Sequence, residues 1–413
     1  MSDLSGVKIE KGRLGANRRN LSFAISGLVI SAIAASALPL DTPTTVYNMN
    51  DVKVLGITAE YDTTNNMNVH RHISEFYRNA GEGTELHLML VAQSVDLPTI
   101  CETKAQLLLA NAKGNIKQLA IAVNLEASAT VVLLNGMPTE VYNAIPKAQA
   151  LYEWADAHFM PCQIILECYQ NTGSASSSAD LRNLENLEAD KVTLVNGQDF
   201  LYASTKTGHA QKFADVGTVL GVMAKANVNQ NIGNNEIFNI TDGTKGIWIE
   251  PGISSHKTNT ELIEYLQTLE NKGYVFGVTY TGLAGVRLNN DHVCAPVVID
   301  ADFKVNEHTI ALGRTSDKAR RELRSVYLPK VKTDWLLDET TGKLRPATVV
   351  ALEDIGDKVF DDMVRNGEIT YGKTSVDANS DLIVAKELIV SYVIVPRGNI
   401  GEIKGTINFK TQV

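Results

Sequence analysis

The histidine and serine side chains are the first residues of this sequence to consider for metal or nucleophilic chemistry. His70 and His72 are two residues apart in a stretch with helical character, so their side chains would diverge by about 200° around the axis. Ser174–Ser178 lie in a loop to which no histidine base can be assigned. We therefore predict no metal site and no catalytic residue here, and we expect the two histidines at a solvent-exposed helix start.

The cysteines are the other candidate ligands and nucleophiles. The chain has four, Cys101, Cys162, Cys168 and Cys294, and they form no C-x-x-C pair and have no histidine at zinc-finger spacing. Cys162 and Cys168 lie at opposite ends of one predicted strand, too far apart to share a metal ion. We predict buried thiols in a protein of a reducing compartment.

Sequence motifs for enzymatic chemistry are also missing. The chain contains no phosphate loop (G-x-x-x-x-G-K-[ST]), no G-x-G-x-x-G, no G-x-S-x-G and no H-E-x-x-H. We expect no cofactor and no enzymatic activity. A cytoplasmic α/β enzyme of unknown substrate remains an alternative, although no motif supports it.

The length and charge limit the remaining classes. With 413 residues, 44% of them apolar and 21% charged, the chain is an ordinary globular protein of two or three domains. Its net charge of −9 disfavours a protein that coats nucleic acid, because such binding depends on many Lys and Arg side chains at the phosphates.

The elements that would position these residues alternate between strand and helix over the first half of the chain. The apolar patterns predict strands at 85–92, 116–123, 162–168 and 192–195, and helices at 69–79, 99–113, 138–157 and 210–226. Such an alternation is typical of an α/β fold with a mostly parallel sheet between layers of helices.

An uncharged run at residues 21–40 has more than one interpretation. It is long enough to span a bilayer, basic residues precede it, and Ala35-Ser36-Ala37 resembles a signal-peptidase site. Its serines and glycine, however, are unusual in the apolar core of a signal peptide. The alternative is a pair of buried strands interrupted at Ser26-Gly27.

The second half differs in composition. Residues 227–258 are rich in Asn and Gly, which suggests a domain boundary near 250. Thr258 and Glu261 then form a capping box. A basic helix is predicted at 315–328 and an acidic helix at 347–366, followed by an apolar strand at 388–395.

The chain ends carry a strand pattern that has no evident partner. Residues 402–410 alternate strictly, with Ile403, Ile407 and Phe409 on one face, and residues 6–13 alternate more briefly, with Val7 and Ile9 on one side. These segments would either pair with the chain's own sheet or add to the sheet of another subunit, which is β-augmentation. Head-to-tail contacts of the second kind build rings or helical filaments.

The order of several loose motifs resembles that of the sheath proteins of contractile phage tails and related injection systems. The similarity includes Gly6–Glu10, LSFAISGLV, Leu40-Asp41-Thr42-Pro43 and residues 73–92, and is strongest in Gly313-Arg314-Thr315-x-Asp317-Lys318-Ala319, Leu328-Pro329, Thr341-Gly342 and LIVSYVIVPRGNIGEIKGTINF. Residues 95–250 match only as a generic α/β insertion.

The resemblance implies a multi-domain α/β (α+β) protein: an N-terminal linking arm (1–20), an outer α/β domain (21–250), an inner sheath domain of mixed sheet and helices (251–397) and a C-terminal linking strand (398–413). It implies hexameric rings stacked in a helical sleeve around an inner tail tube, in a virion tail assembled in the host cytoplasm. The expected partners are other copies and the tube, baseplate and tail terminator proteins, without nucleic acid or membrane insertion.

Residue roles follow from the same resemblance. It assigns the linking contacts to Val7, Ile9, Ile403, Ile407 and Phe409, and we expect the basic helix, through Lys318, Arg321 and Arg324, to face the tube. Charge pairs in water suit a contact that must release, since each is worth only about 0–1 kcal/mol.

The main rival is a secreted or envelope-associated α/β binding protein or hydrolase from which residues 1–37 have been removed. N-terminal sequencing distinguishes it, because a mature chain would begin near Leu38.

Overall fold

Strand β1 (Ser26–Ala32) lies at the centre of the main sheet of this protein. The computed structural model describes residues 22–410, and in it all seven residues of β1 are buried between two parallel neighbours. The uncharged run therefore contributes one core strand rather than two, and cleavage after Ala37 would remove the centre of the sheet. The strand continues through Gly27, where glycine allows close packing. A Cβ there would lie within 3.0 Å of side-chain atoms of Leu119 and Ile116.

The main sheet has six strands and is mostly parallel, as the alternation predicted. Five strands are parallel and the edge strand β2 is antiparallel. In spatial order the strands are β2 (Thr44–Val46), β3 (Leu86–Ala92), β1, β4 (Gln118–Ala122), β7 (Gln163–Glu167) and β8 (Val192–Val195).

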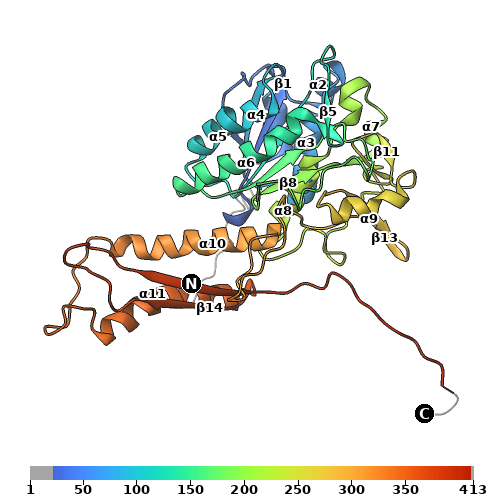
Figure 1. Cartoon of the computed structure of the whole chain (residues 1–413). Helices are drawn as coiled ribbons and strands as arrows, with labels where there is room; N and C mark the ends of the chain where they lie inside the picture. The colour runs from blue at the N-terminus through green and yellow to red at the C-terminus, as the bar shows by residue number, and fades with distance from the viewer. Residues whose placement is uncertain (1–21, 411–413) are drawn as a thin grey trace, which may run out of the picture.

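Helices cover both faces of this sheet (Figure 1). Alternate residues of β1 point to opposite faces, so Leu28 and Ile30 join one core while Val29 joins the other. The first core includes α1 (Met49–Val54), α2 (Ala59–Thr64), α3 (Val69–Ala80) and α8 (Val216–Lys225). The second includes α4 (Leu97–Thr99), a π-helical turn (Ile100–Lys104), α5 (Ala105–Ala112) and α6 (Thr139–Ala157).

The helices α3 and α8 cross with almost no space between their backbones. A Cβ atom at Gly217 would lie 2.2 Å from the carbonyl oxygen of His72, and one at Gly221 would lie 2.7 Å from that of Phe76. Glycines four residues apart thus allow α8 to contact α3 directly.

Buried charges fix the same region. The guanidinium of Arg71 donates to Asp215 at 2.7 Å and to Asp199 at 3.2 Å, and all three side chains are buried. Burial lowers the pKa of Arg71, but the carboxylates of Asp215, Glu75 and Asp199 outweigh it and raise that pKa above its ordinary value. A hydrogen-bonded ion network therefore joins α3, α8 and the strand that contains Asp199.

A small second sheet follows in the chain and packs on the main sheet and its helices, with which it forms the first unit. It consists of β9 (Gly197–Asp199), β10 (Pro251–Ile253) and β11 (Lys257–Thr258), and near it lie α7 (Phe200–Ala203), α9 (Ile263–Asn271) and the hairpin β12 (Gly277–Tyr280)–β13 (Leu283–Leu288). Side chains from Ile253 to Ala295 belong to the same two cores. The Asn/Gly-rich stretch is therefore an excursion within one packed unit, and the domain boundary near residue 250 stays a prediction.

The reciprocal hydrogen bonds predicted between Thr258 and Glu261 form, but they lie in the turn before the helix, whose N-cap Leu262 makes no side-chain capping bond. The Thr258 amide donates to Glu261 Oε2 at 2.7 Å, and the Glu261 amide donates to Thr258 Oγ1 at 3.3 Å. Helix α9 itself begins slightly later, at Ile263.

The second unit contains two helices and a two-stranded sheet (Figure 1). Its elements are α10 (Ile310–Tyr327), a 3-10 turn (Leu328–Lys330), α11 (Pro346–Arg365), β14 (Ile369–Val376) and β15 (Val390–Pro396). Helix α10 belongs to both units, because Ile310 joins a core of the first unit, whereas Ala319 and Leu323 pack against α11.

The remaining elements are short: two 3-10 turns at Ser22–Ala24 and Gly208–Lys212 and the hairpin β5 (Leu133–Leu134)–β6 (Met137–Pro138). Within residues 22–410, no helix combines the length and the apolarity needed to cross a bilayer.

Candidate functional site

The first candidate site is the crevice at the carboxyl ends of the parallel strands. In the sheet, β1 lies between β3 and β4, so the strand order reverses there. Doubly wound sheets bind ligands at such a reversal point. A cavity of about 580 Å³ lies there, and its lining includes Ile33 after β1, Gln93 after β3 and Gln170 after β7.

The chain's own loop spans this crevice. His209 Nδ1 accepts from the amide of Gln170 at 2.7 Å, and its Nε2 donates to the carbonyl of Ala129 at 3.0 Å. Asn66 donates to the carbonyl of Thr207 at 3.0 Å. These bonds engage both ring nitrogens of the only histidine in the lining and hold residues 207–212 across the crevice.

The histidines and cysteines singled out in the sequence do not converge. Among the described residues, no group of three or more His, Cys, Asp or Glu side chains is placed to hold a metal ion. The four cysteines are all free and buried, and burial raises the pKa of Cys162 and of Cys294 to about 12. Ser178, in the serine loop, is also buried, and its carbonyl accepts from Lys272 at 2.6 Å.

His72 departs from the expectation of a solvent-exposed helix start. It is buried against α8, and its Nδ1 accepts from the Gly217 amide at 3.3 Å. Burial lowers the pKa of His72 to about 4, although nearby Asp215 acts in the opposite direction. The polar residues of α3 are buried because α8 supplies partners for them.

The second candidate site is the seam between the first unit and α10. Lys191, just before β8, binds Asp317 Oδ1 at 2.9 Å and the Gly313 carbonyl at 3.1 Å, and it also pairs with Glu307. Burial lowers the pKa of Lys191, but the carboxylates of Asp317 and Glu307 outweigh it and raise that pKa above its ordinary value. Gly313 is necessary here, because a Cβ would lie 2.9 Å from Gln163 Oε1 and 3.3 Å from Lys191 Nζ.

Further polar contacts extend the seam toward α6. Tyr152 donates to Asp317 at 3.2 Å and accepts from Arg320 at 2.8 Å, and Arg320 also binds Asp156 at 2.5 Å. Gly313 and Asp317 belong to the motif Gly313-Arg314-Thr315-x-Asp317-Lys318-Ala319, so the residues that resemble a known family pattern are those that hold α10 to the sheet.

The three cations expected to face an inner tube lie within this chain's own contacts. Lys318 binds Glu368 at 2.6 Å, and the Arg324 guanidinium lies 3.4 Å from the centroid of the Phe159 ring. The Nε and Nη2 atoms of Arg321 are buried and have no hydrogen-bond partner in the described part of the chain. Lys318 and Arg321 are half-buried, whereas Arg324 is exposed, and the tube-facing role of these three residues stays a prediction.

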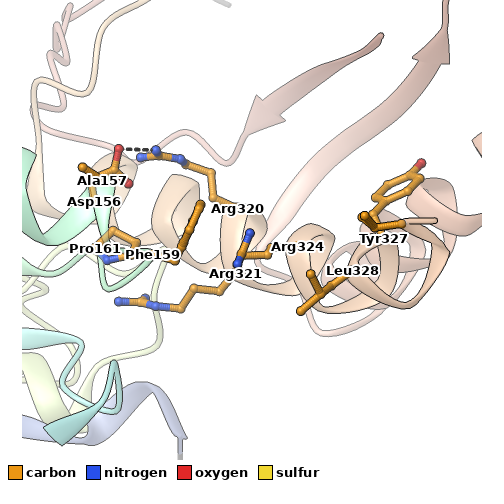
Figure 2. Close-up of a pocket in the computed structure, with 10 residues that line it drawn as sticks. Asp156, Ala157, Phe159, Pro161, Arg320, Arg321, Arg324, Tyr327 and Leu328 are labelled. Carbon is orange, nitrogen blue, oxygen red and sulfur yellow. Dashed lines mark hydrogen bonds and ion pairs between the residues drawn. The ribbon is translucent and has the colours of Figure 1, made fainter. Parts of the chain in front are cut away.

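Figure 2 shows a cavity of about 460 Å³ where α10 passes the end of α6. Arg320, Arg321 and Arg324 line one side of it, and Asp156 and Phe159 line the other. The Arg320–Asp156 pair closes one end, and the Phe159 ring lies over α10. The cavity marks the outer margin of the seam.

The acidic helix α11 presents a more open face. Leu352, Val359, Phe360 and Met363 are buried, while Asp354, Asp361 and Asp362 are exposed. Asp357 is engaged instead, because it accepts from the Thr374 amide of β14 at 2.8 Å.

The C-terminal segment leaves β15 and extends away from both units (Figure 1). All described residues from Arg397 to Lys410 are exposed, and the exposed fractions of Ile403, Ile407 and Phe409 are 84%, 86% and 98%. The segment therefore does not pair with the chain's own sheet. Val7 and Ile9 lie outside the described residues.

Two family models match the sequence. One is described as DUF2586, N-terminal domain, and covers residues 12–292; the other is described as DUF2586, C-terminal domain, and covers residues 302–413. The chain belongs to the DUF2586 family. The two matches meet near residue 300, where the packing also changes. No curated protein matches the sequence of this DUF2586 member.

Solved structures show what fold this DUF2586 member has. A chain of the six-fold symmetrised anti-feeding prophage baseplate aligns with a TM-score of 0.61 and 12% identity, covering 100% of both chains. A chain of the contracted helical sheath of the same prophage aligns with a TM-score of 0.58 and 13% identity, again covering 100% of both chains. A chain of the contracted PVC sheath complex, from an extracellular contractile injection system, aligns with a TM-score of 0.57 and 11% identity. The alignment covers 100% of this chain and 99% of that one.

The DUF2586 member thus has the mixed α/β, multi-domain fold of contractile sheath proteins, which confirms the resemblance found in the sequence. Sequence reasoning did not identify Lys191, Glu307 or Tyr152 as seam residues. A lone Lys before an apolar strand carries no local signal of its partner; only the quoted motif around Asp317 pointed to this place.

Proposed function

We propose that this protein is a structural subunit of a contractile sheath. Copies would assemble as stacked hexameric rings in a helical sleeve around an inner tube, and contraction of the sleeve would drive the tube through a target cell envelope. The role is structural rather than enzymatic. Support comes from the sheath fold and, above all, from the exposed C-terminal segment.

The C-terminal segment is the observation that carries this proposal. It places Ile403, Ile407 and Phe409 in water on one side of an extended backbone, which is unfavourable for an isolated chain. Alternation of apolar and polar residues fits a strand that lies on a partner's apolar surface. We infer that the segment adds to a sheet of another copy.

The two-stranded sheet of the second unit is a suitable acceptor. Strands β14 and β15 pair with each other, and within the described chain no further strand pairs with either of them. Two-stranded sheets are only marginally stable in water, so added strands would stabilise this one. Addition of one copy's segment to the next copy is a head-to-tail contact, which generates rings or helices.

The N-terminal linking role of Val7 and Ile9 stays part of the proposal. These residues precede Ser22, which lies at the seam between the units.

The contact with the tube is better assigned to α11 than to α10. Lys318 of α10 is paired with Glu368 within the subunit, and the guanidinium of the exposed Arg324 lies on the Phe159 ring, whereas α11 presents the exposed carboxylates of Asp354 and Asp361. We therefore propose the acidic face of α11 in place of Lys318, Arg321 and Arg324. When the sheath is co-expressed with its tube protein, Asp361→Lys should prevent sleeves from forming around tubes and leave sheath-only polymers; unchanged sleeves would exclude this face.

The further partners in this proposal are the baseplate and tail terminator proteins at the two ends of the sleeve. The particle would be a virion tail or a phage-derived injection system assembled in the host cytoplasm.

Electron microscopy of the purified full-length protein tests the proposal. We expect tubes or stacked rings from the full chain and only single subunits or short oligomers after deletion of residues 401–413, with unchanged circular dichroism. Tubes that persist after the deletion would contradict the role of the segment. A full-length protein that stays monomeric even with a co-expressed tube protein would contradict the sheath function itself.

A further inference from the structure

A cavity of about 220 Å³ lies inside the seam, at the point where the described chain begins. It is formed by Ser22 and Phe23, by Lys117 from just before β4, by Val228 after α8 and by one side of α10. From α10 come Arg314, Asp317, Lys318, Arg321, Glu322 and Ser325. Its walls therefore come from both units.

The carboxylates in this lining already have cationic partners. Asp317 binds Lys191 at 2.9 Å. Glu322 lies 3.5 Å from Lys318, which also binds Glu368 at 2.6 Å. Asp317 Oδ2 makes no further hydrogen bond in the described part of the chain, and the charge of Asp317 also acts on Arg321 and Lys117, although it forms an ion pair with neither.

Three cations in the lining have no acidic partner. Lys117 donates to the Gly114 carbonyl at 2.7 Å, and Arg314 donates to the Ala226 and Asn227 carbonyls at 3.1 and 3.3 Å. Arg321 makes no hydrogen bond through Nε or Nη2, although both atoms are buried. In residues 22–410, no carboxylate forms an ion pair with any of the three.

Burial without a counter-charge is unfavourable for all three groups. It lowers the pKa of Lys117 to about 8, with a smaller effect from nearby Arg321, and lowers the pKa of Arg314 to about 10. Burial also lowers the pKa of Arg321, although Asp317 acts against it. Buried charges in proteins are normally paired, so an additional anion between these three cations would stabilise them.

We propose that this cavity binds a small tetrahedral oxyanion such as inorganic phosphate. Guanidinium groups bind oxyanions through two parallel N–H donors, and Arg321, one of the lining residues, has two buried nitrogen atoms, Nε and Nη2, without a hydrogen-bond partner in the described part of the chain. The volume is below the range of cavities that hold drug-sized ligands, so it suits a single small anion rather than a nucleotide. The bound anion would join Arg314 and Arg321 of α10 to Lys117 of the first unit and so hold the seam closed.

Calorimetric titration of inorganic phosphate into the full-length protein, at constant ionic strength, tests this inference. We expect saturable binding of one anion per chain, weakened at least tenfold by Arg321→Gln. The matched control is Arg324→Gln, one turn away on α10, which removes a guanidinium that lies on Phe159 outside this cavity and should leave phosphate affinity unchanged.

A second variant keeps the proposal testable if the first one does not fold. If Arg321→Gln fails to fold, Lys117→Gln should show the same tenfold loss, because it removes a cation from the other unit. Absence of saturable binding, or equal affinity of the Lys117 and Arg324 variants, would overturn the proposal. Binding that arises only after deletion of residues 1–20 would also overturn it, since a carboxylate of that segment would then be the occupant.

Discussion

Lys191 and Asp317 lie 126 residues apart in the sequence and form a buried ion pair of 2.9 Å between Nζ and Oδ1. Lys191 precedes the edge strand β8 and Asp317 lies in α10, so the pair joins the main sheet to the helix shared by both units. Only 1% and 2% of the two side chains are exposed. The relative position of the two units therefore depends on a contact shielded from water.

Loss of this pair should strongly destabilise the protein. Asp317→Ala leaves the buried Lys191 with Glu307 as its remaining acidic partner, and removal of one member of a buried pair typically costs about 3–5 kcal/mol. Urea denaturation followed by circular dichroism measures the change in the free energy of unfolding. The control is Asp362→Ala, which breaks an exposed pair with Arg365 and should cost less than about 1 kcal/mol. Similar losses in the two variants would contradict the structural role of Asp317.

A methyl group at the crossing of α3 and α8 should also destabilise the first unit. In Gly217→Ala the new Cβ would lie 2.2 Å from the His72 carbonyl oxygen, and two helix backbones must separate to accept it. Overpacking of this kind costs about 1–3 kcal/mol, and we expect a melting temperature lower by several degrees. Gly243→Ala is the matched control, since a Cβ there meets no atom within 4 Å. Equal melting temperatures for the two variants would show that the helices are not in such close contact.

The acid sensitivity of the fold should depend partly on His72. Burial lowers its pKa from an ordinary 6.5 to about 4, while Asp215 opposes and Arg71 reinforces this shift. The unfolded chain therefore binds a proton at a higher pH than the folded chain, so this contribution to stability is complete above pH 6.5 and is lost as the pH falls toward 4.

The substitution His72→Gln removes this titration and keeps an acceptor for the Gly217 amide. Between pH 7 and pH 4 we expect wild type to lose roughly 2–3 kcal/mol more than the variant, as measured by urea denaturation at each pH. Parallel pH profiles for the two proteins would mean that the pKa of His72 is the same in the folded and the unfolded chain.

The linking role of the C-terminal segment predicts that its two faces respond differently to substitution. Ile407→Asp places a charge on the face proposed to pack on a neighbouring copy and should abolish long polymers. Thr406→Asp adds the same charge to the opposite face and should leave polymers intact. Both residues are exposed in the subunit, so neither change should alter its melting temperature appreciably. Sedimentation and electron microscopy provide the readout, and equal effects of the two variants would contradict a face-specific contact.

Local patterns in the sequence determined most of the secondary structure. The apolar strands, the α3, α6 and α11 helices, the Thr258–Glu261 hydrogen bonds and the exposed alternation near Phe409 can all be recognised from residues close together in the chain. A periodicity of two or of 3.6 residues reports such interactions directly. The sequence also carried the order of motifs that resembles sheath proteins, which the fold confirmed.

Only the tertiary structure decided which polar residues are buried and what they contact. His72 and Arg71 have polar side chains that a local pattern assigns to the surface, yet α8 covers them and supplies Asp215 as their partner. Lys318 looked like part of an exposed basic face, whereas Glu368 binds it in the fold.

The contacts in the seam and in its cationic cavity were also decided only by the tertiary structure. Their charges come from distant parts of the chain, including Lys117, Lys191 and Asp317, and no short-range pattern records which of them meet. The energy of such contacts depends on burial and on the distance between charges, and both exist only once the two units have packed around α10.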